Sequence, residues 1–196
     1  STNDLGTPFT KGQEVTLTAV IGEQRPQLLP GKQRVSGVDA GEAINLVWNE
    51  GDQIKVIVGK ESVIFTLTSG AGSSDGSFTG KMPADGTSFH VEYPIDYSDD
   101  VLKVQQYVPN GFGKGLMKMS TKKAGTIDNG FTLSADNALL GLQLTGDGEI
   151  DKIVLSRNNA EGTAGDLSYT LLCPNVTLSA DPILFYIVVL PGTWAN

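Results

Sequence analysis

The sequence offers few residues that could carry out catalysis, because its 196 residues include one histidine and one cysteine. The segment Gly72-Ser73-Ser74-Asp75-Gly76 matches the G-x-S-x-G pattern of hydrolases, with Ser74 as nucleophile and His90 as the one available base. That pattern requires a strand before the serine and a helix after it, which together hold the hydroxyl on a strained turn. Strands are predicted on both sides here, so the favoured interpretation is a hairpin loop, and a serine hydrolase is the remote alternative.

His90 and Cys173 give no further support for an active site. A single histidine cannot supply the paired ligands of a zinc site, and His90 alternates with apolar neighbours in a predicted strand. Cys173 lies between Leu172 and Pro174, apolar surroundings that raise a thiol pKa and make the thiolate scarce. We therefore interpret Cys173 as a core or edge residue that forms no disulfide within the chain.

Two acidic runs are the candidates for a hard cation such as calcium, which prefers six to eight oxygen ligands from a tightly turning loop. Neither run has the twelve-residue loop pattern with a central glycine and a terminal glutamate. A solvated run of charge is the favoured interpretation, and we expect no metal, cofactor or catalytic residue. The two runs are Asp96, Asp99 and Asp100, and Asp147, Glu149 and Asp151.

Several aromatic residues offer an alternative binding function, the stacking of a sugar on an exposed ring. Aromatic residues that alternate within strands more often belong to the core, where their large area is buried. A surface protein that binds glycan through exposed aromatics is therefore the second hypothesis. Its candidate residues are Trp48, Trp194, Tyr93, Tyr97 and Tyr107.

Composition narrows the class of protein and its partners. The 14 Lys and Arg residues against 22 Asp and Glu residues give a formal net charge of −8. This excess of acid argues against nucleic acid, whose binding depends on clustered basic residues, and against an anionic membrane surface. The 24 glycines and 9 prolines suit many short strands and turns better than helices.

The pattern of apolar residues predicts an all-β protein. Residues 15–21 alternate as a half-buried strand does, and no segment of 12 or more residues carries a helical apolar stripe. Residues 183–190 are apolar on both faces and are predicted to form a central strand. The other predicted strands cover residues 35–38, 44–48, 54–58, 63–68, 77–80, 89–93, 104–108, 116–119, 138–144, 150–155, 167–172 and 176–178.

Length and apolar runs bound the domain organisation. About 150 residues per domain predicts one large domain or two small ones, and no apolar run reaches the 18 residues of a membrane span. We expect residues 1–14 to be a flexible lead and residues 15–193 to form one β-sandwich of about 10–13 short strands with long loops. The start at Ser1 favours a signal segment that has been removed.

Short motifs follow one another along almost the whole chain. The first is Trp48-Asn49-Glu50-Gly51-Asp52, an acidic turn after a predicted strand. The next lie at residues 65–70 and 76–80, at Tyr93-Pro94, and at Leu190-Pro191-Gly192-Thr193. In type and order these motifs resemble the fimbrillin-like surface proteins of Gram-negative anaerobes of the gut and mouth. Two departures are the missing histidine before residues 137–144 and the end at Asn196, where family members continue into a second domain.

The resemblance implies a transthyretin-like antiparallel β-sandwich and an exported lipoprotein of the cell surface, outer membrane or fimbrium. It implies a structural or adhesive role in a pilus, with subunits that join by strand exchange and with a host protein or glycan as receptor. Membrane contact would come from an N-terminal lipid anchor outside this sequence. Arg34 is the candidate processing site, at which a protease would release the N-terminal strand. The motif residues with an implied structural role are Trp48, Gly51, Asp52, Tyr93, Pro94, Pro191 and Gly192.

Overall fold

A computed structural model of the protein describes residues 6–29, 42–158 and 164–192. The all-β prediction is confirmed, since the described chain has no helix longer than a single short 3-10 turn. The strands fall into two compact units, each assembled from three separate segments of the chain. Unit 1 comprises residues 1–24, 45–97 and 118–136, and unit 2 comprises residues 25–44, 98–117 and 137–196.

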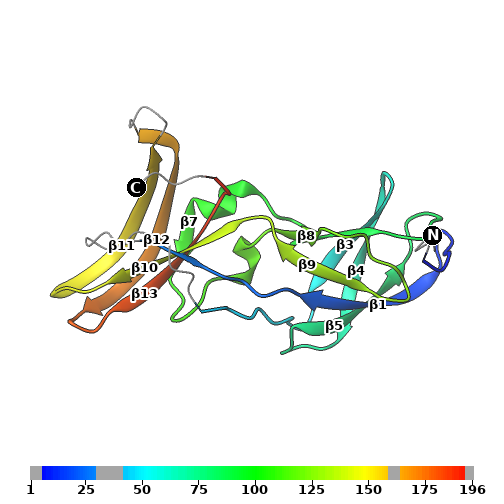
Figure 1. Cartoon of the computed structure of the whole chain (residues 1–196), viewed down its shortest axis with the longest axis horizontal. Coiled ribbons are helices and arrows are strands. Elements are labelled where there is room, and N and C mark those ends of the chain that lie inside the picture. Colours follow the sequence, from blue (N-terminus) through cyan, green and yellow to red (C-terminus); the bar gives the residue numbers. More distant parts are fainter. Residues whose placement is uncertain (1–5, 30–41, 159–163, 193–196) are drawn as a thin grey trace, which may run out of the picture. The chain divides into compact units, whose positions relative to one another are not determined.

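Unit 1 is a closed β-barrel of seven strands. The sequence predicted one sandwich over residues 15–193 and did not predict a barrel. Hairpin pairs β3–β4 and β4–β5 are antiparallel, as the short turns between them predict, and a parallel pairing of β1 with β9 closes the barrel. Figure 1 shows β1 in blue beside β5 and β9. Around the barrel the order is β1 (Glu14–Ile21), β5 (Asp75–Lys81), β4 (Glu61–Ser69), β3 (Gln53–Val58), β6 (His90–Tyr93), β8 (Met119–Thr121) and β9 (Phe131–Ala135).

Aromatic rings fill the barrel core. Trp48 meets Phe78 edge-on at 4.8 Å between ring centroids and Tyr93 at 5.6 Å, arrangements that suit the ring quadrupoles. Alternation of apolar residues places one face of each strand inward, as in β1, where Leu17 and Ala19 are fully buried. The alternation of residues 15–21 therefore predicted which side of β1 faces the core.

Residues 6–14 are held against the barrel, although the sequence predicted a flexible lead there. Phe9 is 2% exposed and pairs with Gly86 through two backbone hydrogen bonds of 2.8 and 3.1 Å. The backbone N–H of Gly12 donates to the carbonyl of Met82. A single buried aromatic residue is enough to anchor this segment, and an alternation rule does not detect it.

Unit 2 contains two three-stranded sheets that share one core. One has the order β13 (Ile183–Val189), β10 (Ala138–Leu144), β2 (Gln27–Leu28), and the other β11 (Gly148–Asn158), β12 (Ala164–Leu178), β7 (Val104–Gln106). The short 3-10 turns η1 (Asp99–Leu102) and η2 (Lys114–Leu116) complete the unit. The predicted strands 167–172 and 176–178 are one strand, β12, that continues through Asn175 at a positive φ of 61°.

The prediction that residues 183–190 form a central strand is wrong, because β13 lies at the edge of its sheet. The backbone groups of Val188 and the N–H of the following Leu190 are hydrogen-bonded by side chains instead of by another strand. Gln105 accepts from the N–H of Val188 at 3.0 Å and donates to its carbonyl at 2.6 Å, and Tyr169 accepts from the N–H of Leu190 at 3.1 Å. An edge strand buried on both faces has the same apolar sequence as a central one.

Other differences concern short or irregular strands. Residues 44–48 were predicted as a strand but form none. Of the predicted strand 116–119, Met119 alone belongs to a strand, as the first residue of β8. Strand β9 was not predicted, although it closes the barrel. The predicted strand 35–38 falls outside the described residues.

Candidate functional site

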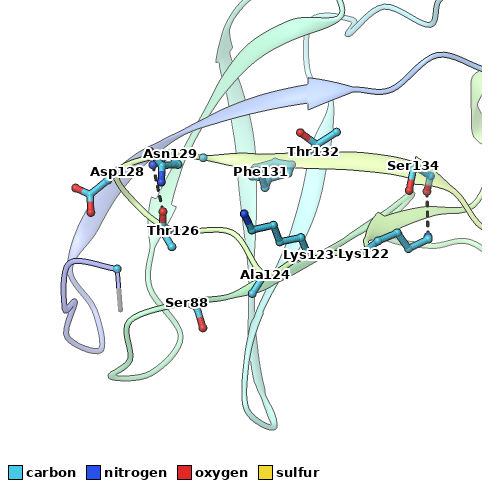
Figure 2. A pocket seen from close by; sticks show the side chains of 12 residues that line it. Ser88, Lys122, Lys123, Ala124, Thr126, Asp128, Asn129, Phe131, Thr132 and Ser134 are labelled. Atoms are coloured by element: carbon cyan, nitrogen blue, oxygen red, sulfur yellow. Dashed lines mark hydrogen bonds between the residues drawn. The ribbon is translucent and has the colours of Figure 1, made fainter. Parts of the chain in front are cut away.

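The described part of unit 1 contains a hollow of about 780 Å³ on the wall of the barrel. Strand β9 supplies one side, and the connection between β8 and β9 supplies the other (Figure 2). Thr132 and Ser134 face the hollow because Phe131 and Leu133, which alternate with them, point into the barrel core. The residues that line it are Gly6, Ser88, Lys122, Lys123, Ala124, Thr126, Asp128, Asn129, Gly130, Phe131, Thr132 and Ser134.

Tight turns shape the β8–β9 connection. Thr126 and Gly130 form a bridge through backbone hydrogen bonds of 3.2 and 2.8 Å, and the N–H of Asn129 donates to the Thr126 hydroxyl at 3.2 Å. Gly130 has a φ of 68°, and a Cβ there would lie 2.1 Å from the carbonyl oxygen of Thr18. Glycine at this position therefore lets the connection approach β1 closely.

The two lysines of the hollow differ in their partners. The Lys122 ammonium forms an ion pair with Asp136 and donates to the Ser120 hydroxyl at 3.0 Å. It also donates to the carbonyl of Ser134 at 3.3 Å. Among the described residues, no such partner lies beside the ammonium of Lys123. Figure 2 shows the Lys123 side chain extended between Thr126 and β9.

The acidic residue of the hollow is occupied by the N-terminal segment. The Asp128 carboxylate accepts from the N–H of Thr7 at 3.1 Å and from its hydroxyl at 2.6 Å. The hydroxyl and backbone hydrogen bonds from Thr7 stabilise the ionised form and hold the pKa of Asp128 below its ordinary value. The negative charge of Asp128 is thus directed at Thr7.

Ser74 and His90, the residues of the remote hydrolase hypothesis, are not brought together. The Ser74 hydroxyl donates to the carbonyl of Leu46 at 2.8 Å, whereas Nδ1 of His90 lies 3.0 Å from the hydroxyl of Thr121. Ser74 lies beside Ile21, at the C-terminal end of β1. His90 lies opposite Ile57 of β3, at the other end of the barrel strands. This geometry offers no nucleophile and base within one hydrogen bond.

The surroundings of the candidate cation ligands and of Cys173 show no metal-binding or reactive arrangement among the described residues. Within the described residues, no three His, Cys, Asp or Glu side chains gather in a group that could hold a metal ion. Asp100 forms an exposed ion pair of 2.7 Å with Lys103, whose hydrogen bond lowers the pKa of Asp100. Cys173 is buried, and burial raises the pKa of its thiol.

The described aromatic residues proposed for sugar stacking are buried or half-buried. Trp48 is fully buried and Tyr93 is 7% exposed, and both belong to the barrel core. Tyr97 and Tyr107 are half-buried, and the ring of Tyr107 packs against Phe185 at 5.0 Å. Trp194 lies outside the described residues. The described rings therefore give no support to the stacking hypothesis.

The motif at residues 48–52 forms a tight turn that leads into β3. The N–H of Asn49 donates to the carboxylate of Asp52 at 2.8 Å, and Gly51 has a φ of 84°, which favours glycine. Burial, followed by the negative charge of Asp52, raises the pKa of Tyr93 above its ordinary value. Asp52 thus stabilises the turn and also lies near the buried Tyr93 of the barrel core.

The remaining motif and processing residues lie in different settings. Pro94 is half-buried directly after β6, and Pro191 and Gly192 are exposed after β13. Arg34 lies outside the described residues. Strand β1, which cleavage at Arg34 would release with the N-terminal segment, forms hydrogen bonds along both of its edges, with β5 and with β9.

Sequence reasoning missed the hollow because the residues that form it belong to no recognised motif. Lys122 and Lys123 are adjacent in a stretch without regular alternation, and they differ because Asp136 binds one of them. The hydroxyls of β9 could have been found had that strand been predicted.

Comparisons of the chain with protein-family models, with curated proteins and with solved structures find no match. No helix of the described residues is long and apolar enough to cross a membrane. The fimbrillin-like resemblance of the sequence therefore stays a prediction.

Proposed function

We propose that the protein is a structural or adhesive component of a cell-surface fimbrium or pilus, and that it assembles by strand addition. The observation that carries this proposal is the position of β1. It pairs with β5 over seven residue pairs and with β9 over three, and it is the strand through which the barrel closes. Its release would leave two unpaired strand edges, to which a segment of another subunit could bind.

The inner face of β1 gives this exchange its specificity. Leu17 lies opposite Phe78 on β5, and Ile21 lies opposite Leu133 on β9. All four side chains are buried, so removal of β1 would expose an apolar groove beside the two edges. A replacement strand needs apolar residues at alternate positions, as in Leu17, Ala19 and Ile21.

The same proposal includes the transthyretin-like sandwich, a surface or outer-membrane location, and a lipid anchor. In unit 2, the side chain of Gln105 on β7 binds the backbone of β13, and Tyr107 packs on Phe185. Two sheets with a common core support a sandwich arrangement for that unit. The expected partners are pilin-like subunits or a second copy of this chain, with a host protein or glycan as receptor.

Limited digestion with trypsin followed by size-exclusion chromatography tests the proposal. We expect cleavage after Arg34 to release β1 and to yield a ladder of oligomers. An excess of a synthetic peptide with the sequence of residues 14–21 should suppress the ladder by filling the groove. The double variant Lys32→Gln/Arg34→Gln, which removes both tryptic sites of this stretch of the chain, provides the matched control. A cleaved protein that remains monomeric would count against strand exchange.

A further inference from the structure

The hollow beside β9 presents a cation whose charge no described residue neutralises. Lys122 is paired with Asp136, and the carboxylate of Asp128 is bound by Thr7, so Lys123 has no acidic partner among the described residues. Its side chain is exposed and lies along the hollow (Figure 2). A ligand that carries one negative charge would supply the missing partner.

Side chains with hydroxyl groups line the same hollow as Lys123. Ser88, Thr132 and Ser134 line the hollow, and within the described chain none of their hydroxyls is engaged by another protein group. The Thr126 hydroxyl accepts from Asn129 and keeps its own O–H free to donate. Each hydroxyl can both donate and accept, which matches a ligand that itself carries several hydroxyls.

The size and charge of the hollow indicate a small organic ligand better than a phosphate. Its volume of about 780 Å³ falls in the range of small-molecule sites, roughly 300–1,000 Å³. Protein sites for phosphate groups gather several basic residues or the N–H groups at the start of a helix. The described lining offers one available cation and no helix.

We propose that this hollow binds a sugar that bears a single carboxylate. Lys123 pairs with the carboxylate, and the hydroxyls of Ser88, Thr132 and Ser134 form hydrogen bonds with the ring hydroxyls. This site uses a cation and hydroxyl groups, whereas the stacking hypothesis relied on aromatic faces. Because Lys123 is exposed, binding is weak and falls as the salt concentration rises.

An NMR titration of the ¹⁵N-labelled full chain with glucuronate, glucose and acetate tests this proposal. We expect glucuronate to shift the amide signals of Lys123, Thr126 and Thr132 and to bind about fivefold more tightly than glucose, the gain expected from an exposed ion pair. Acetate, which lacks the ring hydroxyls, should bind more weakly than glucuronate.

Lys123→Gln should reduce the affinity for glucuronate to that for glucose, while Lys60→Gln, an equal change of charge in the exposed β3–β4 turn, should leave it unchanged. The amide spectrum of each variant shows whether the barrel remains folded. Equal affinity for glucuronate and glucose, equal affinity for glucuronate and acetate, or no effect of Lys123→Gln would overturn the proposal. Absence of any shift with glucuronate would overturn it as well.

Discussion

Gly80 and Gly76 on the inner face of β5 leave space for aromatic rings in the barrel. A Cβ on Gly80 would lie 2.4 Å from the ring of Phe65, and a Cβ on Gly76 would lie 2.8 Å from the ring of Trp48. Both distances are shorter than any packed side chain tolerates. The pattern Gly-Ser-Phe-Thr-Gly therefore places one large ring, Phe78, between two gaps that the rings of Trp48 and Phe65 fill.

Gly80→Ala should lower the free energy of unfolding by about 1–3 kcal/mol, because the methyl group overpacks the core against Phe65. Urea denaturation measures this change. Ser77→Ala on the same strand provides the control and should change the stability by less than about 0.5 kcal/mol. Equal stability of the two variants would show that the Phe65 ring moves aside without cost.

Gln105 and Gln106 are adjacent residues of one type in different surroundings. Gln105 is 2% exposed and binds both backbone groups of Val188, whereas Gln106 is exposed. Gln105→Leu should cost about 1–3 kcal/mol of stability, because it leaves buried backbone groups without partners. Gln106→Leu, compared in the same urea denaturation, should have little effect. A stability loss shared by both variants would contradict this role for Gln105.

At the scale of elements, the N-terminal segment is attached to the β8–β9 connection through Thr7 and Asp128. Hydrogen bonds from Thr7 lower the pKa of Asp128, so the ionised carboxylate favours this attachment above its ordinary pKa of 3.8. The attachment should weaken as the pH falls through the lowered pKa of the folded state. The protection of the Thr7 amide hydrogen, measured by NMR as its exchange rate relative to the intrinsic rate at the same pH, should decrease over that range.

Asp128→Asn should lower the protection of the Thr7 amide at neutral pH and remove the further loss of protection in acid. An Asp128 carboxyl that titrates in the folded protein with its ordinary pKa would contradict the attachment.

At the scale of the whole molecule, the chain passes between the two units five times, after residues 24, 44, 97, 117 and 136. The segments of each unit are joined by chain that belongs to the other unit. When one unit unfolds, these connections become long flexible loops within the other unit, and the entropy cost of closing them rises. We expect one cooperative thermal transition by calorimetry, with Gly80→Ala and Gln105→Leu each lowering the same Tm. Two separate transitions, each moved by one variant, would contradict this coupling.

The sequence by itself determined the all-β class and most of the strands, because alternation at residues 15–21 and 54–58 records which side chains are buried. It also located the turn at residues 48–52, since the positive φ at Gly51 requires a permissive residue. Strand alternation and turn conformation depend on residues that are adjacent in the chain, so the local sequence predicts them.

The pairing of strands that are distant in the sequence, and therefore the position of the hollow, became visible with the tertiary structure. The parallel pairing of β1 with β9 joins residues more than a hundred positions apart, and the same strand sequence could close a barrel or extend a sheet. Gln105 binds the backbone of Val188 on the edge strand β13, and Asp136 binds Lys122 and leaves its neighbour Lys123 without an acidic partner among the described residues. Such contacts follow from the packing of distant segments, so no local pattern encodes them.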